Sequence, residues 1–442
     1  MIRSLLTAVA VSLFAFPSFA QDGCTSVGCG ASGCAETGCG EATPAPPWMG
    51  DLSTRAALTG DWGGLRSSLA ESGVTFTGNT TQFFFGNVDG GADTGWRWGG
   101  HNDYTLNIDL DKAIGLKGNL LKIKAEHRYG RDVNPLAGTL LPATIATRLP
   151  IADSENIYLT NVLFTQFLSE TSAVYFGKLD TLDGDLNSYA HGRGIRQFSN
   201  TSLITNPALL RVVPYSTLGA GALFILGPES VVNVGVLNAV DTADTAGFNE
   251  LFNEGAVITA EGRFATEFFG KPGHQLIGGA WSSRDFVSLD QDPRIIFPPA
   301  GIPIARQSSS WAVYYNFDQA LVVDPCNPAR HWGLFGRFGI TDGNPNPIDY
   351  FLSFGVGGSS MISGRDADTW GVGWFKNSIS DELGAAATAF LGLGDGYGVE
   401  AFYNLEVTPW LHLTTDLQYL EPSSSARGDD SFLIGFRASI DL

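Results

Sequence analysis

Residues 399–442 are VEAFYNLEVTPWLHLTTDLQYLEPSSSARGDDSFLIGFRASIDL, and three runs within this stretch alternate apolar with polar side chains. In the last run one face carries only apolar side chains, namely Phe432, Ile434, Phe436, Ala438, Ile440 and Leu442. A period of two with one apolar face is typical of antiparallel strands. Each run is about ten residues long, which is the length that a tilted strand needs to cross a bilayer.

The connections between these runs alternate in length as well. A tight turn at Thr408 and Pro409 joins the first two runs, and a longer polar loop over residues 421–430 joins the last two. Short turns on one side and long loops on the other are typical of outer-membrane barrels. An antiparallel soluble sandwich also alternates, so the three runs alone leave both folds open.

The start of the chain indicates export. Arg3 precedes an apolar run from Leu5 to Phe16, and small residues lead to a cleavage site after Ala20. Residues 1–20 are therefore predicted to be a secretory signal peptide. No run of about 18 apolar residues follows it, which excludes membrane-spanning helices. The chain is nevertheless 44% hydrophobic and 12% aromatic with 55 glycines, a composition that fits an exported β protein.

Residues 21–57 are rich in cysteine and proline and are predicted to form a flexible periplasmic segment. Cysteines recur at every fifth position, as Cys24, Cys29, Cys34 and Cys39, before a proline-rich exit. In an oxidising compartment they could form two disulfides or cross-link to other envelope proteins. A plain linker of small residues is the second possibility. Zinc is disfavoured because structural zinc sites space their cysteines differently. The role of Cys326, in a predicted turn, stays open.

A strand count over the rest of the chain predicts an all-β fold, a transmembrane antiparallel β-barrel of about 16 strands. The strands are expected to begin near Val74, Tyr104, Asn119, Asn156, Ser172, Thr217, Val231, Ala256, His274, Ser309, His331, Ile348, Asp368, Gly398, Trp410 and Ser431. Every second connection is longer. The long connections, expected outside the cell or folded into the mouth, are residues 86–103, 130–155, 181–216, 241–255 and 285–308.

A short N-terminal helix is predicted before the first strand, over residues 58–73. Asp61 can cap its start and Gly73 can end it. Its stretch LTGDWGGLRSSLAESGV resembles the opening motif of the carbohydrate-selective porins, the OprB family. The ending EAFYNLEVTPWLHLTTDLQYLEP is similar to the penultimate hairpin of that family, and GKLDTLDG, LFGRFGITDGNPNPIDYFLSFGV and SGRDADTWGVGWF match its pattern in between.

The resemblance runs in order from Leu58 to Leu442, so it covers the predicted barrel domain of residues 58–442, with the barrel itself over residues 74–442. It departs from the family in the cysteine repeat, in residues 131–155 and in the final Leu442, where an aromatic residue is more usual. It implies a porin of the bacterial outer membrane for passive, carbohydrate-selective diffusion of sugars and small neutral solutes. It implies no cofactor.

Charged side chains at alternate strand positions are predicted to face the lumen, since Lys or Arg facing lipid at mid-membrane would cost roughly 2–4 kcal/mol. They are Lys122, Lys124, Glu126, Arg128, Glu261, Arg263, Arg337, Glu400, Asp416 and Gln418. Such a mixed set suits a constriction for polyhydroxylated solutes, in which Arg and Glu contact hydroxyls. The alternative is that these groups only solvate a water-filled wall.

Residues in two predicted loops are further candidates for sugar contact, because aromatic rings can stack on sugar faces. These are Trp96, Trp98 and His101 in the first loop, with Tyr189, His191 and Arg193 in the loop over residues 181–216. The alternative places them in the aromatic belt at the headgroups or in loop packing.

The net charge and the absence of catalytic motifs disfavour several classes of function. At a net charge of −19 the chain lacks the excess of Lys and Arg of an anion pore, so neutral sugars and cations remain, and nucleic acid is disfavoured. A general or cation-preferring diffusion porin with an envelope-tethering arm is the alternative function. An outer-membrane lipase could use His127, but no Gly-x-Ser-x-Gly or His-Glu-x-x-His motif supports an enzyme. The expected partners are outer-membrane lipid, small sugars and envelope proteins bound through the arm; monomer and trimer stay open.

Overall fold

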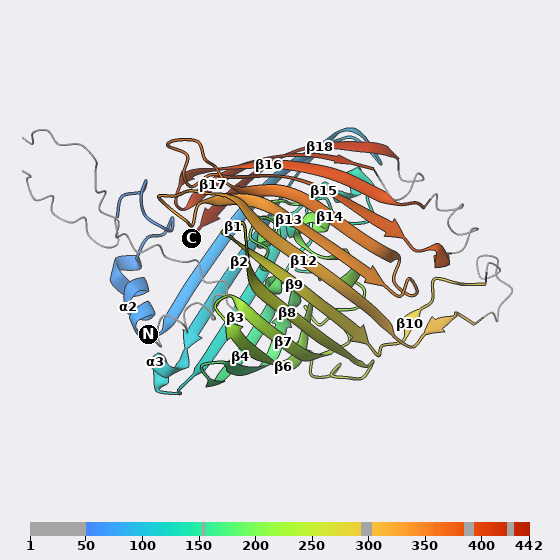
Figure 1. The fold of residues 1–442 in the computed structure, drawn as a ribbon, viewed down its shortest axis with the longest axis horizontal. Coiled ribbons are helices and arrows are strands. Elements are labelled where there is room, and N and C mark those ends of the chain that lie inside the picture. Colours follow the sequence, from blue (N-terminus) through green and yellow to red (C-terminus); the bar gives the residue numbers. More distant parts are fainter. Residues whose placement is uncertain (1–49, 153–154, 293–302, 384–392, 422–427) are drawn as a thin grey trace, which may run out of the picture.

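The computed structural model describes residues 50–152, 155–292, 303–383, 393–421 and 428–442 (Figure 1). The predicted signal peptide and the cysteine repeat lie outside the described residues. None of the described helices is both long enough and apolar enough to cross a membrane.

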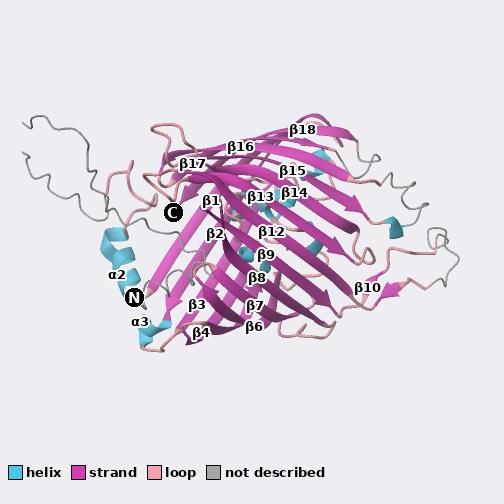
Figure 2. Cartoon of the chain, viewed as in Figure 1, coloured by secondary structure: helices cyan, strands magenta, loops and turns pink. Residues whose placement is uncertain are grey.

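Sixteen antiparallel strands form one closed barrel, in which each strand pairs with its neighbours in sequence and β1 pairs with β18 (Figures 1 and 2). They are β1 (Val74–Gly91), β2 (Gly95–Asp109), β3 (Asn119–Gly130), β4 (Tyr158–Ser169), β5 (Ser172–Asp180), β6 (Ser216–Gly227), β7 (Ser230–Asn238), β8 (Ala256–Phe268), β9 (Lys271–Ser282), β12 (Ser310–Val323), β13 (His331–Thr341), β14 (Ile348–Ser359), β15 (Thr369–Ile379), β16 (Gly396–Thr408), β17 (Leu411–Leu420) and β18 (Asp429–Asp441). The predicted strand number and order are confirmed.

The prediction was wrong for the first long loop. Residues 86–103 do not form a long external loop, because β1 continues to Gly91 and β2 already begins at Gly95. The backbone of Trp96 pairs with that of Gly86, and a Cβ at Gly86 would meet the Trp96 ring at 2.5 Å. The missing side chain of Gly86 thus makes room for the indole. A small two-stranded sheet, β10 (Phe286–Val287) and β11 (Arg306–Gln307), was also not predicted.

The two faces of the wall differ as the alternation predicts. On β18 the side chains of Phe432 and Phe436 are exposed on the outer face, while Leu433, Arg437 and Ser439 are buried on the inner face. Outward aromatic and aliphatic side chains on a closed sheet face lipid. The buried polar side chains of the inner face must therefore find hydrogen-bond or ion-pair partners inside the barrel.

The N-terminal helix is shorter than predicted and consists of a 3-10 turn, η1 (Trp62–Gly64), and α2 (Leu65–Glu71). The helix breaks at Gly63, whose φ of 72° lies in the left-handed region. Asp61 accepts a hydrogen bond from the Ser67 backbone N–H at 2.8 Å. Arg66 donates to the backbone oxygen of Leu442 at 2.6 Å. The helix is therefore fixed at the barrel end where β1 starts and β18 finishes, which is the side of the short turns.

Two long connections fold into the barrel, the β3–β4 loop (residues 131–157) and the β5–β6 loop (residues 181–215). Their short helices, visible inside the strand wall in Figure 2, are α4 (Asn134–Ala137), η2 (Ala146–Arg148), η3 (Thr181–Gly184), η4 (Gly192–Gly194), α5 (Thr201–Ile204) and η5 (Pro207–Leu209). The largest apolar cluster of the described residues lies between these loops and the wall. It joins Leu149, Tyr189, Phe198 and Leu203 of the loops to Phe335 and Phe402 of the strands, among others. The core of the molecule is thus in the lumen.

Two further helical turns of the described residues lie at the ends of strands. They are α3 (Leu110–Ile114), in the connection between β2 and β3, and η7 (Asp381–Leu383), after β15. Asp109 caps α3 by accepting hydrogen bonds from the backbone N–H groups of Asp111 and Lys112.

Candidate functional site

The β5–β6 loop crosses the lumen and binds strands on the far side of the barrel. Asn187 donates to the Asn316 side-chain oxygen on β12 at 2.7 Å, and Arg437 on β18 donates to the Gly194 carbonyl at 2.7 Å. Between these contacts, Asn200 donates to Gln418 on β17 at 3.1 Å. The loop therefore narrows the pore while held to several strands.

Three predicted pore residues lie beneath this loop. The Glu400 carboxylate accepts hydrogen bonds from the backbone N–H groups of Ser199 and Asn200, at 2.5 and 2.9 Å. Gln418 donates to the Ser199 hydroxyl at 2.8 Å, and Asp416 pairs with Arg437 at 2.8 Å. All of these wall side chains face inward but are fully buried. They anchor the loop and do not border open space.

The inward-facing charged side chains of β3 bind the start of the same loop. Lys122 pairs with Asp183 at 2.8 Å, and Lys124 pairs with Asp183 at 2.7 Å and with Asp180 at 3.1 Å. Arg193, from the middle of the loop, pairs with Asp180, Asp183 and Glu126. Burial alone would raise the pKa of Asp183, but Lys122, Lys124 and Arg193 outweigh it and hold that pKa well below its usual value. The carboxylate therefore stays ionised.

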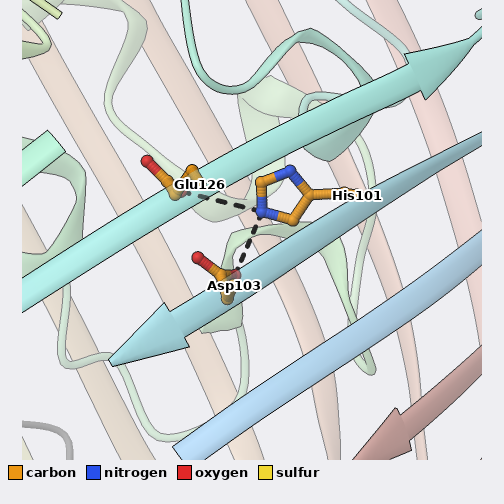
Figure 3. Close-up of side chains that lie close together, drawn as sticks. All are labelled: His101, Asp103 and Glu126. Atoms are coloured by element: carbon orange, nitrogen blue, oxygen red, sulfur yellow. Dashed lines mark hydrogen bonds and ion pairs between the residues drawn. The ribbon is translucent and has the colours of Figure 1, made fainter. Parts of the chain in front are cut away.

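His101 completes this charge network from β2, as Figure 3 shows. Its Nε2 lies 3.0 Å from Asp103 Oδ2 and 3.6 Å from Glu126 Oε1, while its Nδ1 lies 2.9 Å from the Leu149 carbonyl oxygen. Both ring nitrogens face oxygen acceptors, so the ring donates at both only as an imidazolium. In that state four cations face four carboxylates: His101, Lys122, Lys124 and Arg193 against Asp103, Glu126, Asp180 and Asp183.

The group His101, Asp103 and Glu126 also has the residue types of a metal site, with ligand atoms within 4.8 Å of one another. Lys124 Nζ, however, lies 3.6 Å from Asp103 Oδ1 and 3.4 Å from Glu126 Oε1. Arg193 also forms an ion pair with this oxygen of Glu126. Because these oxygens already pair with cations, the residues fit a salt-bridge cluster and do not fit a metal ion.

A cavity of about 220 Å³ remains between the β5–β6 loop and the wall formed by β4, β5, β7, β8, β9, β12 and β13. Of the predicted wall residues, Glu261 and Arg337 line it. Glu261 accepts a hydrogen bond from the Tyr314 hydroxyl at 2.5 Å, and Arg337 pairs with Asp185 at 2.7 Å. Further polar lining comes from Asn161, Asp180, Asp183, Asn206, Asn233 and Asn316.

The other predicted residues lie away from this cavity. Arg128 donates to the Arg148 and Ala152 carbonyls and so binds the β3–β4 loop. Arg263 donates to the Glu229 carbonyl at 3.3 Å. Trp96 and Trp98 belong to β2 and are exposed on the outer face, where Trp96 stacks on Phe84, so they do not contact a solute in the lumen.

The loop candidates have structural contacts. The buried Tyr189 hydroxyl lies 2.7 Å from His331 Nδ1, and the His191 backbone N–H donates to the Gln197 side chain at 2.8 Å. Sequence reasoning missed the cavity residues Asp183, Asp185, Asn206, Asn233, Tyr314 and Asn316. The period of two could have found Asn233, Tyr314 and Asn316, which occupy inward positions of their strands. Asn206 has no such signal, since only the folded loop brings it to the lumen.

A closed sixteen-strand barrel with an apolar outer face and a lumen narrowed by an infolded loop defines an outer-membrane diffusion channel, a porin. Comparison with known families identifies it further. Residues 94–442 match the model of the carbohydrate-selective porins, the OprB family, and the chain belongs to this family. It is an outer-membrane porin for sugar diffusion, as its sequence predicts.

Individual relatives agree with this assignment. The chain is 21% identical to Porin B of Pseudomonas aeruginosa over 414 residues, which cover 86% of this chain and 90% of that protein. Its fold is similar to the high-pH structure of Pseudomonas putida OprB, with a TM-score of 0.76 and 20% identity over 88% of this chain and 99% of that one. The low-pH structure of the same protein is similar with a TM-score of 0.56 and 17% identity, at the same coverage of both chains.

Proposed function

We propose that sugars cross this porin through the cavity between the β5–β6 loop and the wall that includes β7, β8, β9 and β12. The observation that carries the proposal is that the loop buries Glu400, Asp416 and Gln418 on one side of the lumen and leaves polar groups unburied on the other. The open passage is therefore one-sided, and the solute follows β7, β8 and β12.

The lining suits a neutral polyhydroxylated solute. Asn233 offers an amide group, Glu261 offers an acceptor and Tyr314 a hydroxyl on an aromatic ring. Leu237 and Leu276 add apolar surface beside them. Such groups can replace water around sugar hydroxyls where the passage is tight. Both hydroxyls and ring faces of a sugar therefore find a matching surface.

A cation preference is the second candidate function, and it is favoured by the acidic residues at the cavity. Four carboxylates border it, against the single lining cation Arg337 among the described residues; they are Asp180, Asp183, Asp185 and Glu261. All three aspartates already pair with cations, so Glu261 is the carboxylate that would act on passing ions. The two functions can coexist in one pore.

The path is tested by placing a bulky side chain in it. Asn233→Trp should reduce sugar-driven swelling of liposomes severalfold, because the indole would fill the space beside Glu261. The matched control is Val234→Trp, the next residue on β7, whose side chain is exposed on the outer face. Equal swelling rates for the two variants would show that solutes pass elsewhere.

We also propose that the barrel does not catalyse a reaction, in line with a family of channels. A lipase-like site would need a serine hydroxyl bound to the imidazole of His127. Among the described residues, the hydrogen-bond partner of that ring is the Asn102 side chain, at 3.0 Å from Nδ1. His127 instead belongs to a polar group on the outer face of the wall.

A further inference from the structure

Two polar side chains of the cavity wall, Asn233 and Glu261, lie side by side. The strand register places Asn233 on β7 directly opposite Glu261 on β8, and both side chains are partly exposed and line the cavity. Residues paired in this way on one face of an antiparallel sheet have their Cβ atoms roughly 4.5–5.5 Å apart. An amide and a carboxyl group are therefore held next to each other on the proposed path. We call them the amide–carboxyl pair.

A tyrosine hydroxyl fixes each member of the pair. The Tyr175 hydroxyl on β5 donates to Asn233 Oδ1 at 2.8 Å, and the Tyr314 hydroxyl on β12 donates to Glu261 Oε2. Because Tyr175 binds the amide oxygen, the amide cannot flip without losing this bond. Within the part of the chain that the structure describes, neither Asn233 Nδ2 nor Glu261 Oε1 has a hydrogen bond, and neither is one of its buried unpaired atoms. The pair therefore keeps a donor and an acceptor for a solute.

Both tyrosine rings lie against glycines of the neighbouring strands. A Cβ at Gly221 would meet the Tyr175 hydroxyl oxygen at 2.2 Å, and a Cβ at Gly278 would meet Tyr314 Cζ at 2.3 Å. Each glycine is the register partner of its tyrosine, so the absent side chain lets the ring cross that strand and reach the pair. Tyr175 is buried at 3% exposure and acts as a positioning residue. Tyr314 is partly exposed and offers ring surface beside the pair.

A donor and an acceptor held side by side match two neighbouring hydroxyl groups of a solute. One hydroxyl can accept from the amide N–H while the next donates to the carboxyl oxygen. A site built to hydrogen-bond hydroxyls rejects an analogue without them in these places, because its own polar groups are then left unpaired. A saturated ring fixes the spacing of two such hydroxyls, and its C–H face can pack on the ring of Tyr314.

We propose that the amide–carboxyl pair is a subsite that selects ring solutes carrying a vicinal diol, the arrangement that pyranose sugars present. Tyr175 sets the direction of the amide, and Tyr314 sets that of the carboxyl group. This inference rests on the proposed path through the cavity and names the feature of the sugar that the path recognises.

Two isomeric probes test the subsite without a change of solute composition. trans-Cyclohexane-1,2-diol holds its hydroxyls on adjacent carbons, whereas trans-cyclohexane-1,4-diol holds them on opposite sides of the ring. In planar bilayers the vicinal isomer should half-block the ion current at a concentration about fivefold lower, the size of effect expected from one hydrogen bond. Equal half-block concentrations, or block by neither isomer, overturn the proposal.

Removing one tyrosine hydroxyl gives matched variants. Tyr175→Phe and Tyr314→Phe keep the ring but release the amide or the carboxyl group, so each should reduce the preference for the vicinal isomer to about twofold or less. The control is Tyr315→Phe, the next residue on β12, whose hydroxyl donates to Gln275 on the exposed outer face and whose loss should leave the preference intact. Heat-modifiable gel mobility shows which barrels are folded. A preference that persists in the folded phenylalanine variants contradicts the proposal.

Failure of the subsite can be told apart from failure of the path. Equal swelling rates for Asn233→Trp and Val234→Trp would show that solutes do not pass the pair at all. Slow swelling for Asn233→Trp alone, together with no isomer preference in the unmodified protein, would keep the path and overturn only the subsite.

Discussion

Arg193 shows how a single residue can hold the constriction together. Its guanidinium pairs with Asp180 and Asp183 at the start of the β5–β6 loop and with Glu126 on β3, while it lies 5.8 Å from the Tyr215 ring centre. Removing one partner of a buried ion pair costs roughly 3–5 kcal/mol, because the remaining charge is uncompensated. The loop thus depends on this side chain for its position.

Arg193→Gln should therefore loosen the loop, raise single-channel conductance and weaken sugar-dependent current block. Planar-bilayer recording with and without sugar measures both effects. Arg196→Gln is the matched control, because Arg196 lies on the same loop and pairs with the partly exposed Asp441 at 2.6 Å. If both variants conduct alike, the charge network does not hold the constriction.

For single residues, the sequence predicts whether a strand side chain faces the lumen or the lipid, but it does not predict its ion-pair partner. Lys122, Lys124 and Glu126 were placed inward by the period of two, and they do lie on the inner face. Their partner Arg193 was predicted as a sugar contact, because nothing in the local pattern of a loop indicates that it will return to a wall more than sixty residues earlier in the chain. Charge complementarity becomes visible only once the loop is folded.

Among the elements, the β5–β6 loop differs most from what its sequence indicates. It has no periodicity, and its helical turns α5 and η5 are too short to be predicted. Its backbone N–H groups at Ser199 and Asn200 bind Glu400, about 200 residues away in sequence. A long connection folded into the mouth was predicted, but its contact surface was not, since that surface comes from distant strands.

The N-terminal segment should be separable from the pore. α2 is held to the barrel by Arg66 and Leu442, and the Leu58 N–H donates to the Asp441 carbonyl at 2.7 Å. These contacts do not involve residues 21–47. Deleting residues 21–47 should therefore leave single-channel conductance unchanged in planar bilayers.

The control for this deletion is Arg66→Ala, which removes a contact of the helix itself and should make the conductance less uniform between recordings. A severalfold change of conductance on deleting residues 21–47 would place the segment in the pore. Comparing complexes on reducing and non-reducing gels would then show whether its cysteines cross-link to envelope proteins.

For the whole molecule, closure of the barrel depends on the pairing of β1 with β18. Gly435 pairs with Phe85 across this seam, and a Cβ at Gly435 would meet the Phe85 ring at 2.1 Å. Overpacking of this kind costs roughly 1–3 kcal/mol. Gly435→Val should therefore lower the temperature at which the folded gel mobility is lost.

Ile434→Val is the control at the neighbouring outward position of the same strand. Far-UV circular dichroism in detergent should show β-structure for both variants before heating. A Gly435→Val barrel that is as heat-resistant as the control would mean that Phe85 can move aside without cost.

Strand number, order and facing were predictable because each depends on a repeat of two residues and on turns within the sequence. The end of β1 and the start of β2 could not be predicted in this way. They depend on the packing of the Trp96 ring against Gly86 across the hairpin, which the local sequence pattern does not indicate. The same holds for the one-sided lumen, which depends on where a loop without periodicity binds.

The loop across the lumen also constrains the order in which the molecule can assemble. Its anchors Glu400, Gln418 and Arg437 belong to β16, β17 and β18, and the bond from Arg437 to Gly194 spans 243 residues of sequence. Contacts so distant along the chain form late, because the intervening segment must first be ordered. Until the last three strands join the wall, the loop has no surface to bind on that side. The constriction is therefore expected to form together with closure of the barrel, because the strands that close the wall are the same strands that hold the loop.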